Sequence, residues 1–270
     1  MGFFRNNNNG LTDFSAIATD LHCHVLPGMD DGAATMSESL KMLTEMARLG
    51  FTKIIATPHV VSTLYPNTRE QILGQVSHLQ EVIEERLKAQ GSGQNEGLKA
   101  QGAGLKEGDK AQGARIKIEG SGEYHMDDEL LGLVHSGEVI PFGKLNYLLV
   151  ELPWSKPWFS YEEVLREIQA AGYVPIIAHP ERYAWLMGNM KLYQKLIDMG
   201  MLFQLNLNSL NGLYGFQARM AAHQLIDAEM ISFTGSDAHY MGHVNELSKV
   251  LQNKHFAKLV HSGRLLNSEL

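Results

Sequence analysis

Short apolar runs alternate with amphipathic stretches along most of the chain, which predicts repeated strand–helix units. Residues 35–49 place Met36, Leu40, Leu43 and Met46 at helical spacing, so one face of a helix is expected to be buried there. Other runs are continuously apolar, which is typical of strands buried on both faces of a parallel sheet. The seven expected strands are 18–26, 53–57, 117–122, 147–152, 174–178, 202–207 and 232–235.

Local signals mark where the intervening helices begin and end. Capping boxes pair a Ser or Thr with a Glu or Gln three residues later, and Gly often follows the last turn of a helix. The expected boxes are Thr35 with Glu38, Thr68 with Gln71 and Ser160 with Glu163, and the expected terminal glycines are Gly50, Gly172 and Gly200. Seven strand–helix units predict an α/β fold and fit a seven-stranded barrel.

Residues 88–114 break this alternation. The tetrapeptide KAQG begins at Lys88, Lys99 and Lys110, so it repeats every 11 residues. That period can give a right-handed coiled coil, but Leu98 and Leu105 are almost the only apolar side chains available for its seam. We favour a mobile surface loop, grown by tandem duplication and inserted at modest entropic cost. We expect an N-terminal extension at 1–18 and one barrel domain at 19–270 carrying this low-complexity insertion.

Composition and charge narrow the class of protein. Of the 270 residues 44% are hydrophobic, which is enough for a sizeable core. Lys and Arg total 23 against 30 Asp and Glu, a formal charge of −7 without a basic stripe, so we expect no nucleic-acid partner. Cys23 is the single cysteine, so no disulfide can form within the chain. With neither a secretory signal nor a run long enough to span a bilayer, we expect a cytoplasmic protein without membrane insertion.

The chemistry gathers where the predicted strands end, because six of the seven finish in His, Asp or Glu. His22 and His24 are two residues apart on a strand, so both imidazoles face one way and Cys23 faces the other. In α/β barrels the active site lies at the carboxyl ends of the strands. We predict that these ends form a polynuclear metal site. The candidate ligands are His22, His24, Asp31 (or its neighbour Asp30), His59, Glu123, Glu151, His179, Asp237 and His239.

The ligand types indicate which metal is bound. Imidazoles and carboxylates without a thiolate suit Mn, Fe or Zn better than Ca or Mg. One ion cannot use all of these ligands, whereas two or three ions can and still leave positions for water and substrate. Three dications would more than offset the carboxylates, and a positive cavity attracts a phosphate dianion.

Six motifs resemble the PHP (polymerase and histidinol phosphatase) family: DLHCHVLPGMDDGA, IIATPH, GSGEYH, LLVELPW, PIIAHPERY and TGSDAH. Within it they are similar to the bacterial metal-dependent protein-tyrosine phosphatases of capsule and exopolysaccharide gene clusters. The resemblance runs from about Asp20 to His239. It implies the PHP fold, a distorted seven-stranded (β/α)7 TIM-like barrel, and a trinuclear site that often holds Mn²⁺. It also implies a phosphotyrosine protein as partner, namely a bacterial tyrosine kinase.

The resemblance also implies roles for single residues. His22 and His24 would be the first ligands of the site and Asp237 would complete it, with Glu123 as a bridging ligand. Glu151 and His179 would serve a second ion, and Asp31, His59 and His239 a third. Arg182 in the HPERY motif resembles a phosphate-binding, catalytic arginine. A second arginine that some relatives carry beyond the SDAH motif is absent, and His243 lies nearby instead.

The expected reaction is hydrolysis of a phosphomonoester by a metal-bridged hydroxide. Histidinol phosphate, or another small phosphomonoester, is the alternative substrate. The acidic charge disfavours a nuclease, and the complete ligand set disfavours a scaffold without catalysis. Trp154, Trp158 and Phe159 either form an apolar wall for an aromatic substrate or simply cover the barrel mouth. His125 and His243 could orient ligands, whereas we expect structural roles for the remaining histidines: His78, His135, His223, His255 and His261.

Overall fold

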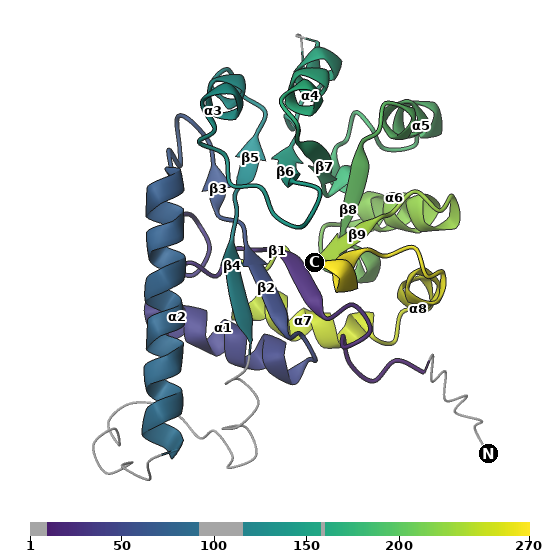
Figure 1. Cartoon of the computed structure of the whole chain (residues 1–270). Coiled ribbons are helices and arrows are strands. Elements are labelled where there is room, and N and C mark those ends of the chain that lie inside the picture. Colours follow the sequence, from purple (N-terminus) through teal and green to yellow (C-terminus); the bar gives the residue numbers. More distant parts are fainter. Residues whose placement is uncertain (1–9, 92–115, 158–159) are drawn as a thin grey trace, which may run out of the picture.

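The computed structural model describes residues 10–91, 116–157 and 160–270, in which strands and helices alternate except at β2–β3, β4–β5 and α7–α8 (Figure 1). The strands are β1 (Thr19–Cys23), β2 (Lys53–Ala56), β3 (His59–Val60), β4 (Lys117–Gly120), β5 (Glu123–His125), β6 (Tyr147–Glu151), β7 (Val174–Ala178), β8 (Leu202–Asn206) and β9 (Phe233–Gly235). The α-helices are α1 (Met36–Arg48), α2 (Arg69–Gly91), α3 (Leu130–Ser136), α4 (Tyr161–Ala170), α5 (Met190–Asp198), α6 (Phe216–Asp227), α7 (Met241–Val250) and α8 (Lys254–His261). The short 3₁₀ helices are η3 (Pro180–Arg182), η4 (Leu207–Asn211) and η5 (Asn267–Glu269).

All neighbouring strands within the sheets are parallel, which confirms the predicted α/β fold. The predicted seven-stranded barrel is not confirmed in that form. The described residues form two sheets instead, one ordered β1-β2-β4 and the other β3-β5-β6-β7-β8-β9. The difference arises because the second and third expected strands are each followed by an additional short strand, β3 or β5, which begins after Thr57-Pro58 or Ser121-Gly122 and pairs in the other sheet. Pro58 has no N–H to donate to a ladder, so pairing resumes only at His59.

The two sheets meet where β1 lies beside the end of β9. The His24 N–H donates to the Ala238 carbonyl (3.0 Å), and the Asp237 N–H donates to the His22 carbonyl (2.8 Å). Between the same two strands, the buried carboxamide of Asn267 donates to the Thr19 and Thr234 carbonyls and accepts from the Thr234 N–H. The C-terminal segment therefore links the first strand to the last, and Figure 1 shows the C terminus lying among the strands.

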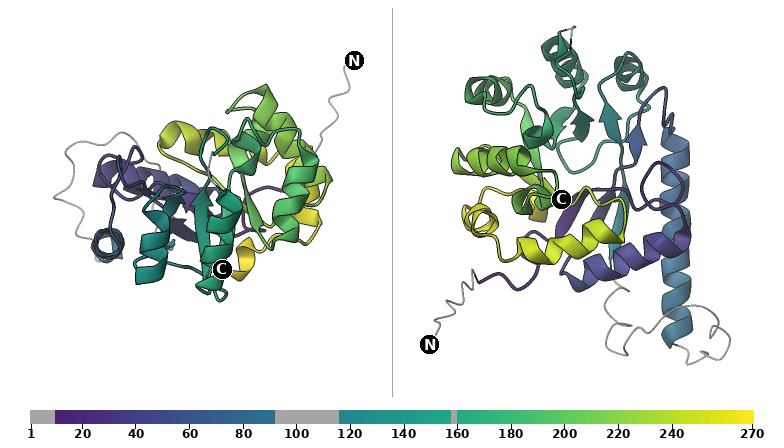
Figure 2. Two further views of the ribbon diagram at one scale, coloured as in Figure 1. Left: turned by 90° about the horizontal axis from the view of Figure 1, so that it is seen from above. Right: turned by 180° about the vertical axis from the view of Figure 1, so that it is seen from behind.

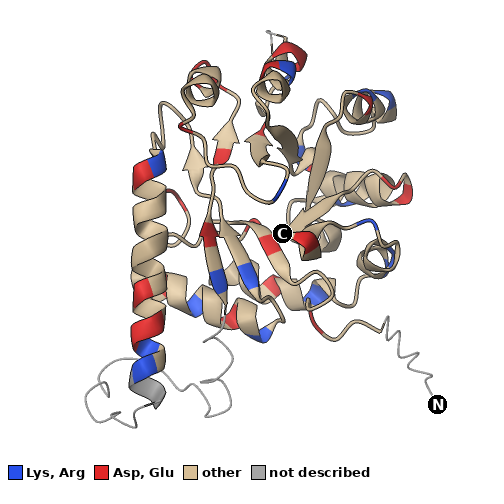
Figure 3. Cartoon of the chain, in the orientation of Figure 1, with Lys and Arg blue, Asp and Glu red and all other residues tan. Residues whose placement is uncertain are grey.

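Most of the strands are buried on both faces, as their apolar runs predicted; β4 is the clearest exception, with Lys117 exposed. One set of side chains packs inside, against the C-terminal Leu266 and Leu270: Leu21, Ile55, Leu149, Ile176, Ala178 and Phe233. The opposite faces pack against the surrounding helices, of which α1 and α7 lie side by side (Figure 2). Both signs of charge are interspersed on the outer helices (Figure 3), as in the ion pair between Lys258 and Asp227. Among the described residues, no helix is both long and apolar enough to cross a membrane.

The observed helix ends can be compared with the predicted capping boxes and terminal glycines. Thr35 and Glu38 form a complete capping box, and Thr68 and Gln71 exchange the same two hydrogen bonds. The box at Ser160 is wrong, because its side chain makes no capping hydrogen bond. With ψ at 84°, Ser160 lacks the extended backbone (ψ 155°) that places the Thr35 hydroxyl over its helix. The three glycines follow their helices with φ of 102°, 92° and 88°, a left-handed geometry that glycine adopts without strain.

Two predicted boundaries shift. Phe14, placed in the N-terminal extension, is fully buried and stacks on Phe51 with ring centroids 4.9 Å apart, so the core begins before residue 18. Helix α2 continues to Gly91, so residues 88–91 are helical rather than a loop. The remainder of the predicted insertion lies outside the described residues. Lys53 pairs with Lys117 at the amino ends of β2 and β4, so the chain enters β4 at the amino-terminal end of the sheet.

Candidate metal centre

The predicted ligands converge at the carboxyl ends of the strands. A cavity of about 370 Å³ opens there, and most of the ligands line it. His22 and His24 lie fully buried at its base. The described residues contain three groups whose ligand atoms lie within 4.8 Å of one another, and together they include every predicted ligand except His179. The groups are His24, Asp31, His59 and His239; His22, His24 and Asp237; and His59, Glu123 and Glu151.

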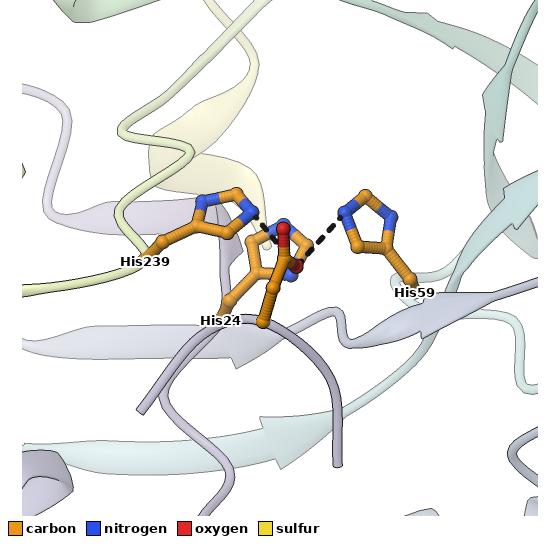
Figure 4. Close-up of side chains that lie close together, drawn as sticks. His24, His59 and His239 are labelled. Atoms are coloured by element: carbon orange, nitrogen blue, oxygen red, sulfur yellow. Dashed lines mark ion pairs between the residues drawn. The ribbon is translucent and has the colours of Figure 1, made fainter. Parts of the chain in front are cut away.

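Figure 4 shows His24, His59 and His239 turned toward one another from three separate segments. The Asp31 Oδ1 atom lies 3.5 Å from the Nε2 atoms of both His59 and His239. His179 approaches from the end of β7, where its Nε2 lies 3.0 Å from Glu123 Oε1 and 3.7 Å from Glu151 Oε1. Every predicted ligand is therefore in direct reach of another.

The alternation along β1 separates the histidines from the cysteine, as the strand pattern predicts. The Nε2 atoms of His22 and His24 lie 3.2 Å apart. The Cys23 sulfur faces the opposite side, 3.8 Å from the sulfur of Met46. Burial raises the pKa of the Cys23 thiol well above its usual value, so this thiol is suited neither to metal binding nor to nucleophilic attack.

Asp30 and Asp31 differ sharply in environment. The Asp30 carboxylate is buried and accepts hydrogen bonds from the backbone N–H groups of Gly32 and His59 (both 2.9 Å), and its Oδ2 lies 2.6 Å from His24 Nδ1. Burial opposes ionisation, but His24 and these donors outweigh it and lower the pKa of Asp30 to about 2. Asp31 is half-exposed and faces the cavity. Asp30 therefore orients His24, while Asp31 is the one open to the cavity.

Glu123 lies at the electrostatic centre of the cluster. Its Oε2 lies 3.0 Å from His59 Nδ1 and 3.2 Å from His22 Nε2, yet this fully buried oxygen has no hydrogen-bond partner. Burial alone would lower the pKa of His22, but the carboxylates of Glu123 and Asp237 raise it to about 9. The same contacts hold the pKa of Glu123 well below its usual range, against its burial. A buried carboxylate oxygen without a hydrogen-bond partner, set among imidazoles, fits a divalent cation, which would satisfy both kinds of ligand.

Arg182 lies at the wall of the cavity, on η3. One of its N–H groups donates to Asp237 Oδ2 (2.7 Å), and its guanidinium packs over the rings of Tyr214 (4.1 Å) and Trp154 (4.9 Å). His179 and Asp237 hold positive φ angles of 32° and 51°. Such backbone strain in residues other than glycine is typical of functional sites, where the surrounding structure must enforce it.

Sequence reasoning missed part of the cavity wall. Leu64 and Tyr65 follow β3, a two-residue strand too short to carry a periodic signal. Tyr65 stacks on His59 with ring centroids 5.7 Å apart, and Trp154 stacks on His179 at 5.5 Å. Trp154, for which two roles were open, thus lines the cavity, whereas Trp158 and Phe159 lie outside the described residues. The histidines considered as orienting groups also contact ligands: His125 Nδ1 lies 2.9 Å from Glu151 Oε2, and His243 Nδ1 accepts the N–H of His239.

Several known proteins are similar to this chain. The tyrosine-protein phosphatase YwqE of Bacillus subtilis is 28% identical over 245 residues, covering 89% of this chain and 86% of that protein. The tyrosine-protein phosphatase CpsB of Streptococcus pneumoniae is 23% identical over 226 residues, covering 82% of each. A crystal structure reported for YwqE and CpsB as metal-dependent tyrosine phosphatases matches with a TM-score of 0.73 and 26% identity, covering 93% of this chain and 95% of that one. The family described as capsular polysaccharide synthesis, CpsB/CapC, matches residues 18–92 and 87–258, and this chain belongs to that family.

Proposed function

We propose that this protein is a metal-dependent protein-tyrosine phosphatase that acts on a bacterial tyrosine kinase in capsule or exopolysaccharide synthesis. The observation that carries the proposal is the convergence of five imidazoles and four carboxylates, Glu123 among them, at a cavity with an arginine and two aromatic rings in its wall. The names of its relatives support the same activity. The expected cytoplasmic location remains a prediction.

The geometry supports a ligand set for two or three ions, for which we propose Mn²⁺, with Fe or Zn as alternatives. His24, Asp31, His59 and His239 would hold one ion, and His22, His24 and Asp237 a second. Glu123 and Glu151, with His59 or His179, would hold the third or bridge the others. We also propose that both sheets together form one distorted barrel, closed between β1 and β9.

The bound ions would acidify a water molecule and neutralise the charge on the phosphate oxygens. Arg182 uses one N–H on Asp237, and its other donors remain for two phosphate oxygens in the planar fork that guanidinium offers. Asp237 holds that guanidinium beside the cluster, and stacking on Tyr214 fixes its plane. A tyrosine phenolate, with a pKa of about 10, leaves without the strong general acid that an alkoxide needs.

The cavity walls favour an aryl phosphate on a protein over a small substrate. Trp154 and Leu64 line the cavity and remain 47% and 71% exposed, so the mouth is apolar and open to solvent. Histidinol phosphate would be better served by a small closed pocket. Trp154 and Tyr65, each stacked on a predicted ligand, offer flat apolar faces to a tyrosine ring.

The test compares phosphate release by the manganese-loaded protein from a phosphotyrosine peptide and from histidinol phosphate. We expect preference for the peptide, and loss of activity on chelation or in Asp237→Asn. Cys23→Ala is the matched control, because a buried thiol with a raised pKa plays no part in this chemistry. Preference for histidinol phosphate would overturn the substrate class, and turnover that survives complete metal removal would overturn the mechanism.

A further inference from the structure

Strand β8 differs from its neighbours because it contributes no predicted ligand, yet its inner face is polar. Gln204 and Asn206 lie two residues apart on this strand, so both side chains face the same way. Both are fully buried. Buried carboxamides are costly unless they are hydrogen-bonded, so their partners indicate why they are there.

The two carboxamides form a continuous chain of hydrogen bonds between predicted ligands. Gln204 Oε1 lies 2.8 Å from His22 Nδ1 and also accepts the backbone N–H of His179 (3.3 Å). Gln204 Nε2 donates to Asn206 Oδ1 (2.9 Å). Asn206 Nδ2 then donates to Asp237 Oδ2 (2.6 Å). The chain thus joins residues at the ends of β1, β7 and β9.

The orientation of both amides is fixed from both ends. At one end the His179 N–H can only donate, so the Gln204 atom facing it must be the oxygen. At the other end the Asp237 carboxylate can only accept, so the Asn206 atom facing it must be the nitrogen. Flipping either amide would set two acceptors or two donors against each other. His22 must therefore donate its Nδ1 proton to Gln204, and Nε2 is then the ring nitrogen left to bind an ion.

The hydrogen-bond chain also determines which atoms of His22 and Asp237 face the cavity. His22 Nε2 faces Glu123 Oε2 (3.2 Å) and Asp237 Oδ1 (3.4 Å), inside the ligand cluster. Asp237 Oδ2 already accepts from Asn206 and from Arg182, so Oδ1 is the oxygen left for an ion. One chain of hydrogen bonds therefore selects a single ligand atom on each of two residues from different strands.

Gly235 leaves room for Gln204 to contact His22 across β9. It lies on β9, between β8 and β1, where a Cβ would come within 2.5 Å of His22 Cβ and 3.0 Å of Gln204 Nε2. Any larger residue would fill the space through which Gln204 reaches across β9 to His22.

We infer that Gln204 and Asn206 are positioning residues that fix His22 as an Nε2 ligand and Asp237 as an Oδ1 ligand. This inference rests on the proposed metal centre and assigns a role to the end of β8, which carries no predicted ligand although its neighbours β7 and β9 each lead into one. Hydrogen-bonded partners of metal ligands fix the tautomer and orientation of the ligand, and their loss typically costs about 10–100-fold in metal affinity.

The test uses Gln204→Met and Asn206→Asp, both close in shape to the native residues. The control is Asn208→Asp, the same amide-to-acid change at a buried residue whose amide donates to the backbone carbonyl of His243. Metal affinity is measured by titrating metal-free protein, after circular dichroism has shown that each variant is folded. We expect affinity to fall about 10–100-fold in the two β8 variants and to stay within about threefold of wild type in the control.

A spectroscopic readout separates positioning from simple loss of packing. In the Zn-loaded, diamagnetic protein, ¹⁵N spectra of the imidazoles should show a slowly exchanging His22 Nδ1 proton and a metal-bound Nε2. We expect that proton to lose its protection in Gln204→Met and to keep it in Asn208→Asp. A His22 bound through Nδ1, or equal metal affinity in wild type and both β8 variants, would overturn the inference while leaving the proposed function standing. Wild-type protein that binds no divalent metal would overturn both.

Discussion

Removing the metal should make the stability of the fold depend on pH in a defined direction. In the metal-free protein, burial disfavours a charged His22, but Glu123 and Asp237 outweigh burial and raise its pKa from 6.5 to about 9. A pKa that is higher in the folded state means that protonation stabilises the fold. The contribution is fully present below pH 6.5 and is lost as the pH rises through about 9. Each pKa unit is worth about 1.4 kcal/mol, so the loss from His22 is about 3 kcal/mol.

The assay is urea unfolding of the metal-free protein at pH 6.5 and pH 9.5. We expect the free energy of unfolding to fall by about 3 kcal/mol, and His24 adds in the same direction because its pKa is also raised. The metal-loaded protein should show a much smaller fall, because an ion replaces the proton on His22. His22→Asn serves as the control, since it removes the titrating group. Stability of the metal-free wild type that stays flat or rises between these pH values would refute the reasoning.

Three further perturbations address other parts of the molecule. Arg182→Lys should lower kcat/KM for a phosphotyrosine peptide on the order of 100-fold, because an ammonium cannot replace the planar fork; steady-state kinetics near wild type would contradict this. Trp154→Ala should raise KM for aryl phosphates on the order of 10-fold while hydrolysis of a small alkyl phosphate stays constant. An equal effect on both substrates would contradict a role for Trp154 in binding the aromatic ring. Asn267→Ala should destabilise the fold by about 3 kcal/mol in urea unfolding, because it leaves three buried backbone groups between β1 and β9 without this hydrogen-bond partner. Metal affinity in the folded protein should not change.

The predicted ligands could be read from the sequence because two simple regularities apply to them. Side chains alternate along a strand, which put His22 and His24 on one face. Parallel strands end at a common edge, which gathered residues as distant in sequence as His59 and Asp237. The first regularity is local to one strand and the second requires only the predicted parallel fold, so no single tertiary contact had to be known.

Other features depend on contacts that no local pattern encodes. Strands β3 and β5 contain two and three residues, too few for a period to appear. Asp30 is distinguished from Asp31 partly by a hydrogen bond from the His59 N–H, which lies 29 residues away along the chain. Asn267 bonds Thr19 across 248 residues, and Gln204 reaches His22 across 182. Buried polar residues of this kind resemble surface residues in a sequence until the fold shows their partners.

The position of the 11-residue repeats has an evolutionary consequence. The chain leaves α2 at Gly91 and enters β4 at its amino-terminal end, whereas the metal centre lies at the carboxyl-terminal ends of the strands (Figure 1). We therefore expect the gain or loss of one repeat unit to leave the distances between the ligands in space unchanged. Selection for catalysis places no direct constraint on the number of repeats, so duplications produced by slippage during replication can persist there. The same position suits the insertion of an affinity tag or a reporter domain.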